Sequence, residues 1–172
     1  LRGPDCAFKQ QMMELSRDLG LGEERVSFQR AVPTDRLVSA AEADGDVGLV
    51  PYTPTGANYA NCSPNKLSQY MSAGLPILAN STNFVKEVVE TAQCGLVVDF
   101  QNERKLVEAV TRLCDYTMRS NYGSNARAYF ERSYNWTAVS DPFYAAVRSS
   151  VSGANSTRLE FFPWSKLESD RA

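Results

Sequence analysis

Hydrophobic positions early in the chain follow a helical period. Four of them are spaced three or four residues apart, as on one face of an α-helix. They are Phe8, Met12, Leu15 and Leu19. Gly20 follows directly, and glycine favours the left-handed backbone that closes many helices. The pattern therefore predicts a surface helix over residues 4–19.

Further along, short apolar runs alternate with amphipathic stretches. The runs predict strands over residues 25–32, 46–52, 75–79 and 95–100. The stretches between and after them predict helices over residues 37–43, 64–73, 83–91, 103–116, 118–130 and 138–151. Thr34 or Asp35 is expected to cap the first of these helices, and Gly74 to end the second. This alternation predicts an α/β fold, with a parallel sheet that helices cover on both faces.

The periodic pattern covers residues 1–151, which are expected to form one domain. A single domain also suits a length of 172 residues. Trp136 is expected to pack between the last two helices, because a large aromatic side chain at a helix junction is usually buried. After residue 151 the periodicity is lost, so residues 152–172 are expected to be a tail or linker.

The charge balance argues against nucleic acid as a partner. The net charge is −2, from 18 basic and 20 acidic residues that are mixed along the chain. There is no histidine and no Cys-x-x-Cys spacing among the four cysteines, so we expect no structural zinc. Asp44 precedes a predicted strand and Asp46 begins it, at the wrong edge of the sheet for a metal site. No signal peptide or bilayer-length apolar run is found, which favours the cytoplasm.

The segment that begins at Ser63 predicts an anion site. Ser63 is a favoured N-cap, and Pro64 suits the first helical position, where an N–H group would have no acceptor. The N–H groups of Asn65 and Lys66 would then face outward at the positive end of the helix dipole. This end lies at the edge where parallel sheets bind ligands. Ordinary capping without a ligand is the alternative. The core face of the helix is expected at Leu67, Tyr70 and Met71.

Five segments, in this order, resemble a known family. They are DVGLVPY, SPNKLSQYMSAGLPILA, KEVVE, CGLVVD and NARAYFERSYNW. Together they are similar to the carboxyl-terminal, nucleotide-sugar-binding half of GT-B "group 1" glycosyltransferases, over residues 3–151. The resemblance implies a Rossmann-like parallel sheet flanked by helices, as in the C-terminal half of a GT-B fold. It also implies that the first strand of this domain, and the basic donor-phosphate residue that follows that strand, are missing from the chain.

The resemblance places a donor site at the predicted anion site. In the family, one glutamate contacts the sugar hydroxyls of the donor, and a second, eight positions later, contacts the ribose. Asn61 and Gln69 stand at these positions here. Amides still form hydrogen bonds with hydroxyls, but they lack the charge that stabilises an oxocarbenium-like centre. The backbone from Cys62 to Asn65, with Lys66 beside it, would hold the distal phosphate.

Three further residues complete the implied donor site. Arg30 stands where the family has a glycine near the nucleotide base, so it would stack on the base or block it. Tyr52 and Thr53 would line the sugar pocket, with ordinary loop residues as the alternative. No cofactor or metal is implied, since the helix dipole and basic side chains stabilise the leaving diphosphate. The implied partners are a nucleotide sugar and an N-terminal acceptor domain, through which any membrane contact would occur.

The leading hypothesis is the donor half of an enzyme that transfers a sugar from a nucleotide diphosphate to an acceptor, with retention of configuration. The catalytic residues are unknown, and this part of the enzyme is expected to be inactive without the acceptor half. The alternative is a non-catalytic donor-binding or scaffolding homologue, which the amides Asn61 and Gln69 suggest. A third hypothesis is a generic sugar- or phosphate-binding α/β domain, with no preference for nucleotide sugars.

Overall fold

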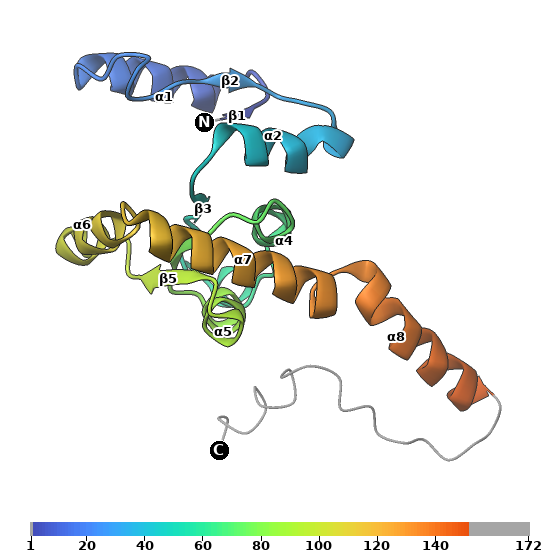
Figure 1. Ribbon diagram of the computed structural model, residues 1–172. Helices are drawn as coiled ribbons and strands as arrows, with labels where there is room; N and C mark the ends of the chain where they lie inside the picture. Colours follow the sequence, from blue (N-terminus) through green and yellow to red (C-terminus); the bar gives the residue numbers. More distant parts are fainter. Residues whose placement is uncertain (1, 152–172) are drawn as a thin grey trace. The chain divides into compact units, whose positions relative to one another are not determined.

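The computed structural model describes residues 2–151, apart from the side chain of Val151. The chain divides into two compact units, of which the first ends at Arg127 and the second begins at Ala128. Figure 1 shows the order of their helices and strands. The predicted tail over residues 152–172 lies outside the described residues.

The strands of the first unit form two parallel sheets. One sheet pairs β1 (Arg2–Gly3) with β2 (Gln29–Arg30). The other contains β3 (Gly48–Val50), β4 (Ile77–Asn80) and β5 (Gly95–Val98), in the order β3-β4-β5. The prediction of parallel pairing is therefore confirmed. The short strand β1 is an element that the sequence pattern did not predict.

Helices make the connections that parallel strands require. In chain order they are α1 (Ala7–Asp18), the 3-10 turn η1 (Thr34–Arg36), α2 (Leu37–Asp44), α3 (Ala57–Ala60), α4 (Asn65–Ser72), α5 (Asn83–Ala92), α6 (Glu103–Arg112), α7 (Tyr116–Ser133) and α8 (Trp136–Val151). Gly20 and Gly74, with φ angles of 66° and 69°, follow α1 and α4 closely, as predicted. No helix within residues 2–151 is both long and apolar enough to cross a membrane.

The core lies on both faces of the three-stranded sheet. On one face, Leu78 of β4 clusters with Ala109 of α6 and with Leu113. Ile77 and Ala79 alternate with Leu78, so they point to the opposite face, and both are fully buried. There α5 contacts β4 and β5, and its buried residues include Val85 and Val89. The prediction of a sheet covered on both faces is confirmed.

The predicted strand over residues 25–32 is mostly wrong, because only Gln29 and Arg30 pair in a sheet. Residues 23–25 form a turn instead. The N–H groups of Arg25 and Val26 donate to the carbonyl of Gly22, at 2.9 and 3.0 Å. Backbone that is bonded within a turn cannot join a ladder, and β1 offers a partner of only two residues.

The ends of two helices also differ from the prediction. Thr34 and Asp35 lie in η1 and do not cap α2, whose N-cap position is taken by Arg36 without a side-chain cap bond. The helix expected over residues 103–116 ends at Arg112. Asp115 Oδ1 then accepts the N–H of Met118 at 2.7 Å, which supports a separate start for α7.

Trp136 is not the packing anchor that the sequence suggested, since it is 67% exposed. The corner before α8 is held by Asn135 instead. Its Oδ1 accepts the N–H of Ala138 at 2.9 Å, and its Nδ2 donates to the carbonyl of Phe130 at 2.6 Å. Because these polar bonds form the corner, the corner does not depend on burial of the indole.

Candidate donor-binding site

The start of α4 lies one residue later than the sequence predicted. Pro64, not Ser63, occupies the N-cap position, with extended backbone at φ −76° and ψ 134°. Proline has no side-chain acceptor, so the capping role assigned to Ser63 is wrong. The N–H of Leu67 donates to the carbonyl of Pro64 at 3.0 Å. The two N–H groups before it, on Asn65 and Lys66, have no acceptor within the helix.

The beginnings of three helices meet one edge of the sheet. Because β3, β4 and β5 are parallel, their carboxyl ends lie at the same edge. The helices α4, α5 and α6 follow these three strands in turn. Asn65 and Lys66 are exposed at the start of α4. An exposed helix N-terminus with a lysine is therefore found where α/β sheets bind ligands.

The inner face of α4 fixes the direction of this helix. Leu67 and Met71 are fully buried, which confirms the prediction for both. Tyr70, the third predicted core residue, is half-buried. Burial raises the pKa of the Tyr70 phenol, and the neighbouring phenol of Tyr52 raises it further. Tyr52, a predicted donor contact, follows β3, and β3 contacts α4. Gln69 is half-buried on the same helix.

Asn61, at the predicted sugar-contact position, is held by two hydrogen bonds. Its Nδ2 donates to the carbonyl of Ala57, the first residue of α3, at 3.0 Å. Its Oδ1 accepts from Asn83 Nδ2 at 3.0 Å. Asn83 is the first residue of α5, so the bond links the loop after β3 with the helix after β4. The side chain of Asn61 thus orients its own loop.

For Thr53 and Cys62, the predicted contact with the donor stays a prediction. Thr53 is exposed, and its carbonyl accepts the N–H of Thr55 at 2.8 Å. Cys62 is half-buried, and its thiol donates to the carbonyl of Tyr59 at 3.3 Å.

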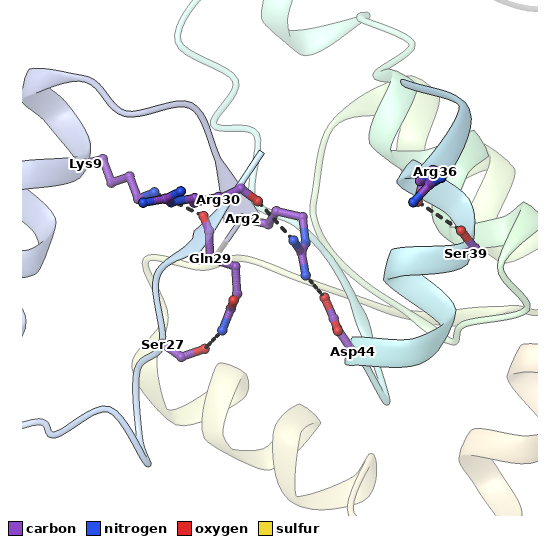
Figure 2. A network of polar contacts seen from close by, with 8 residues as sticks. All are labelled: Arg2, Lys9, Ser27, Gln29, Arg30, Arg36, Ser39 and Asp44. Atoms are coloured by element: carbon purple, nitrogen blue, oxygen red, sulfur yellow. Dashed lines mark hydrogen bonds and ion pairs between the residues drawn. The ribbon is translucent and has the colours of Figure 1, made fainter. Parts of the chain in front are cut away.

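Arg30 lies in a different sheet from the one that carries α4. It is an exposed residue of β2, and its carbonyl accepts Arg2 Nη1 at 3.0 Å. Figure 2 shows Arg2 joining this carbonyl to the Asp44 carboxylate, with which Arg2 forms an ion pair. The pKa of Asp5 is lowered, chiefly by its hydrogen bond with Lys9 and more weakly by the charge of Arg30. Among the described contacts, none joins Arg30 to α4.

Two asparagines at the ligand edge were missed by sequence reasoning. One is Asn83; the other is Asn80, the last residue of β4. Asn80 Oδ1 accepts the N–H groups of Ser81 and Phe100, at 2.9 and 3.2 Å, and so joins the loops after β4 and β5. Asn80 ends an apolar strand and Asn83 lies three residues further on, and this position at the strand end was a signal that could have found them.

Comparison with known proteins gives the family of the chain. Residues 10–134 match the model of the glucosyltransferase 3-like, C-terminal domain. The chain belongs to this family. Thus the resemblance to the C-terminal half of a GT-B glycosyltransferase is confirmed for the fold. A search of curated proteins found no match.

Solved structures agree with this assignment of the glucosyltransferase 3-like C-terminal domain. WaaG, a glycosyltransferase involved in lipopolysaccharide biosynthesis, is 24% identical, with a TM-score of 0.60; 88% of this chain and 37% of WaaG are covered. Sucrose-phosphate synthase from Thermosynechococcus elongatus is 23% identical, with a TM-score of 0.69 and coverages of 87% and 37%. Anabaena HepE, in complex with UDP, is 21% identical, with a TM-score of 0.65 and coverages of 87% and 40%. The chain therefore spans about two fifths of these proteins or slightly less.

Proposed function

We propose that this domain binds the nucleotide-sugar donor of a glycosyltransferase, and that the start of α4 holds the distal phosphate. One observation carries the proposal: the exposed residues Asn65 and Lys66, whose N–H groups have no acceptor within the helix, begin α4 at the carboxyl edge of the sheet. The dipole of the helix and its unpaired N–H groups favour an anion there. The family assignment and the UDP complex of HepE support a nucleotide as the ligand.

The transfer reaction requires a second domain that supplies the acceptor site. The solved relatives are more than twice as long as this chain, which supports such a domain. In this proposal the nucleotide-sugar donor reacts with retention of configuration and needs no metal. The helix dipole and Lys66 stabilise the leaving diphosphate. Tyr52, Thr53, Asn61 and Gln69 face the sugar and ribose, and Arg30 the base.

A further strand would complete the donor domain on the free edge of β3. Within residues 2–151, β3 pairs with β4 and has no strand on its other side. Leu49 in β3 is 42% exposed, although neighbouring Gly48 and Val50 are buried. The apolar face of α1 is uncovered as well, with Phe8 67% and Leu19 63% exposed. One added apolar strand with its flanking residues would cover such surfaces.

The proposal also includes a cellular compartment and a biosynthetic role. The four cysteines are free thiols, which supports a reducing compartment such as the cytoplasm. WaaG supports a role in polysaccharide biosynthesis, because that relative is involved in lipopolysaccharide biosynthesis. Any peripheral membrane contact is assigned to the acceptor half.

A non-catalytic donor-binding homologue is the second candidate function. Asn61 favours it, because the side-chain oxygen and nitrogen of this residue are both engaged within the protein. An amide that is already bonded on both ends offers less to a sugar hydroxyl, and it has no charge to stabilise an oxocarbenium-like centre.

Two measurements test these candidates. Addition of UDP to the 172-residue chain is expected to shift the amide NMR signals of Ser63, Asn65 and Lys66, and unmoved signals at millimolar UDP contradict the phosphate role. Sugar transfer by the longer protein with both halves, with and without Gln69→Glu, separates an enzyme from a binding protein. Measurable transfer supports the enzyme; no transfer by either protein, together with UDP binding, supports the non-catalytic homologue.

A further inference from the structure

The side chains of Asn61 and Asn83 connect two segments that meet at the ligand edge. Asn83 Nδ2 donates to Asn61 Oδ1 at 3.0 Å, across 22 residues of sequence. Asn61 Nδ2 in turn donates to the carbonyl of Ala57 at 3.0 Å. The two bonds run in series from the start of α5, through Asn61, to the start of α3.

The two ends of this connection differ in how firmly they are held. Asn83 belongs to α5, which buries Phe84, Val85, Val88, Val89 and Ala92. Asn61 belongs to the segment over residues 51–64, which holds only the four-residue helix α3 and is largely exposed. A packed helix is a fixed anchor, whereas an exposed loop depends on individual bonds for its conformation.

We propose that Asn83 is a positioning residue for donor binding. Through Asn61 it holds the loop that leads into α4, so that the backbone of Cys62 and Ser63 stays in place beside the N–H groups of Asn65 and Lys66. A loop without this bond populates other conformations. The apparent affinity for a ligand is then reduced in proportion to the fraction of molecules that remain competent to bind it. This inference rests on the proposed function, and it assigns a role to Asn83 that requires no contact with the ligand.

The test measures binding of UDP to the 172-residue chain by NMR titration of the amides of Ser63, Asn65 and Lys66. UDP lacks the sugar that the enzyme would transfer, so a lost contact between Asn61 and that sugar cannot affect the result. We expect Asn83→Ala to raise the Kd for UDP roughly two- to tenfold, the range for one lost hydrogen bond. Asn61→Ala removes the same bond from the other side, so it is expected to raise the Kd similarly.

A double-mutant cycle separates positioning from a general loss of structure. If both residues act through the shared bond, the protein with both substitutions has a Kd no higher than that of the weaker-binding single variant. In the absence of UDP, Asn83→Ala is also expected to shift the amide signals of Cys62, Ser63, Asn65 and Lys66. Purely additive losses of affinity, or unmoved signals in this loop, would overturn the proposal.

Asn125→Ala is the matched control. Asn125 is also exposed and also donates to a distant residue, the carbonyl of Gln93 at 2.9 Å across 32 residues. Gln93 lies just before β5, at the amino edge of the sheet. This control is expected to leave the Kd for UDP unchanged, and a rise equal to that of Asn83→Ala would overturn the proposal.

The failure of this inference can be told from the failure of the proposed function. An unmodified chain that does not bind UDP overturns both. An unmodified chain that binds UDP, with an Asn83→Ala variant that binds it equally well, overturns the positioning role alone. If circular dichroism shows that Asn83→Ala is unfolded, Asn61→Ala carries the test by the same criteria.

Discussion

Tyr70 of α4 packs directly against Gly48 of β3. A Cβ atom added to Gly48 would lie 2.5 Å from Cγ of the Tyr70 ring and 2.6 Å from its Cβ. The ring therefore occupies the space that any other residue at position 48 would need. Because Tyr70 is also on the helix that presents Asn65 and Lys66, this contact sets how closely α4 approaches the sheet.

Substitution of Gly48 by alanine is expected to destabilise the protein by about 1–3 kcal/mol, the usual cost of overpacking a core. The change is also expected to weaken UDP binding, because α4 must move. Gly56→Ala is the control, since Gly56 has extended backbone at φ 179° and no atom within 4 Å of an added Cβ. Urea unfolding of the two variants checks the prediction. Equal stability would show that Tyr70 can move aside without cost.

Removal of the positive charge of Lys66 is expected to weaken UDP binding. Lys66 is exposed, and ion pairs at exposed positions contribute up to about 1 kcal/mol, so the Kd in Lys66→Ala should rise roughly two- to fivefold. Added salt should reduce the difference between the two proteins, because salt screens exposed charges. Arg112→Ala, which removes an exposed charge at the far end of α6, is the control. An equal rise in both variants would indicate an effect of net charge alone.

Replacement of Thr82 by valine is expected to stabilise the protein. Thr82 is 2% exposed, and its hydroxyl has no hydrogen-bond partner among the residues that the structure describes. It also makes no cap bond to α5, so valine loses no interaction there. Relief of an unpaired buried hydroxyl should raise the free energy of unfolding by about 1 kcal/mol. Thr82→Ser keeps the hydroxyl and should not stabilise; a less stable Thr82→Val protein would show that the hydroxyl is paired in solution.

Alkaline pH is expected to destabilise the fold through Cys94. This thiol is fully buried, and burial raises its pKa from the usual 9.0 to about 12. Between these values the unfolded chain releases the proton while the folded protein keeps it. The stabilisation is complete below pH 9 and is lost as the pH rises toward 12.

Thermal unfolding at pH 7 and pH 10 checks this effect. Cys94→Ala should show a smaller fall in melting temperature between the two pH values, even though the cavity lowers its stability at both. Some fall should remain, because burial raises the pKa of Tyr70 as well. Cys114→Ala, at an exposed thiol, should behave as the unmodified chain does. An unchanged fall in Cys94→Ala would contradict the assignment to Cys94.

The order and type of most elements could be predicted from the sequence by itself, because they follow from local patterns. Apolar spacing determines α1, α4 and α5, and the continuous apolar run of β4 reflects burial on both faces. Left-handed glycines at positions 20 and 74 mark the turns after two helices. Local sequence patterns also indicated which segment leads from β3 into α4 at the ligand edge.

Only the tertiary structure decided which partners the individual polar groups bind. An amide such as Asn61 can bond to a sugar, to its own loop or to a neighbouring helix, and only the fold brings Asn83 within 3.0 Å of it. The cap of α4 moved from Ser63 to Pro64, since the backbone there is extended. The strand expected over residues 25–32 shrank to Gln29–Arg30, because pairing depends on a neighbouring strand as well as on the sequence of the strand itself.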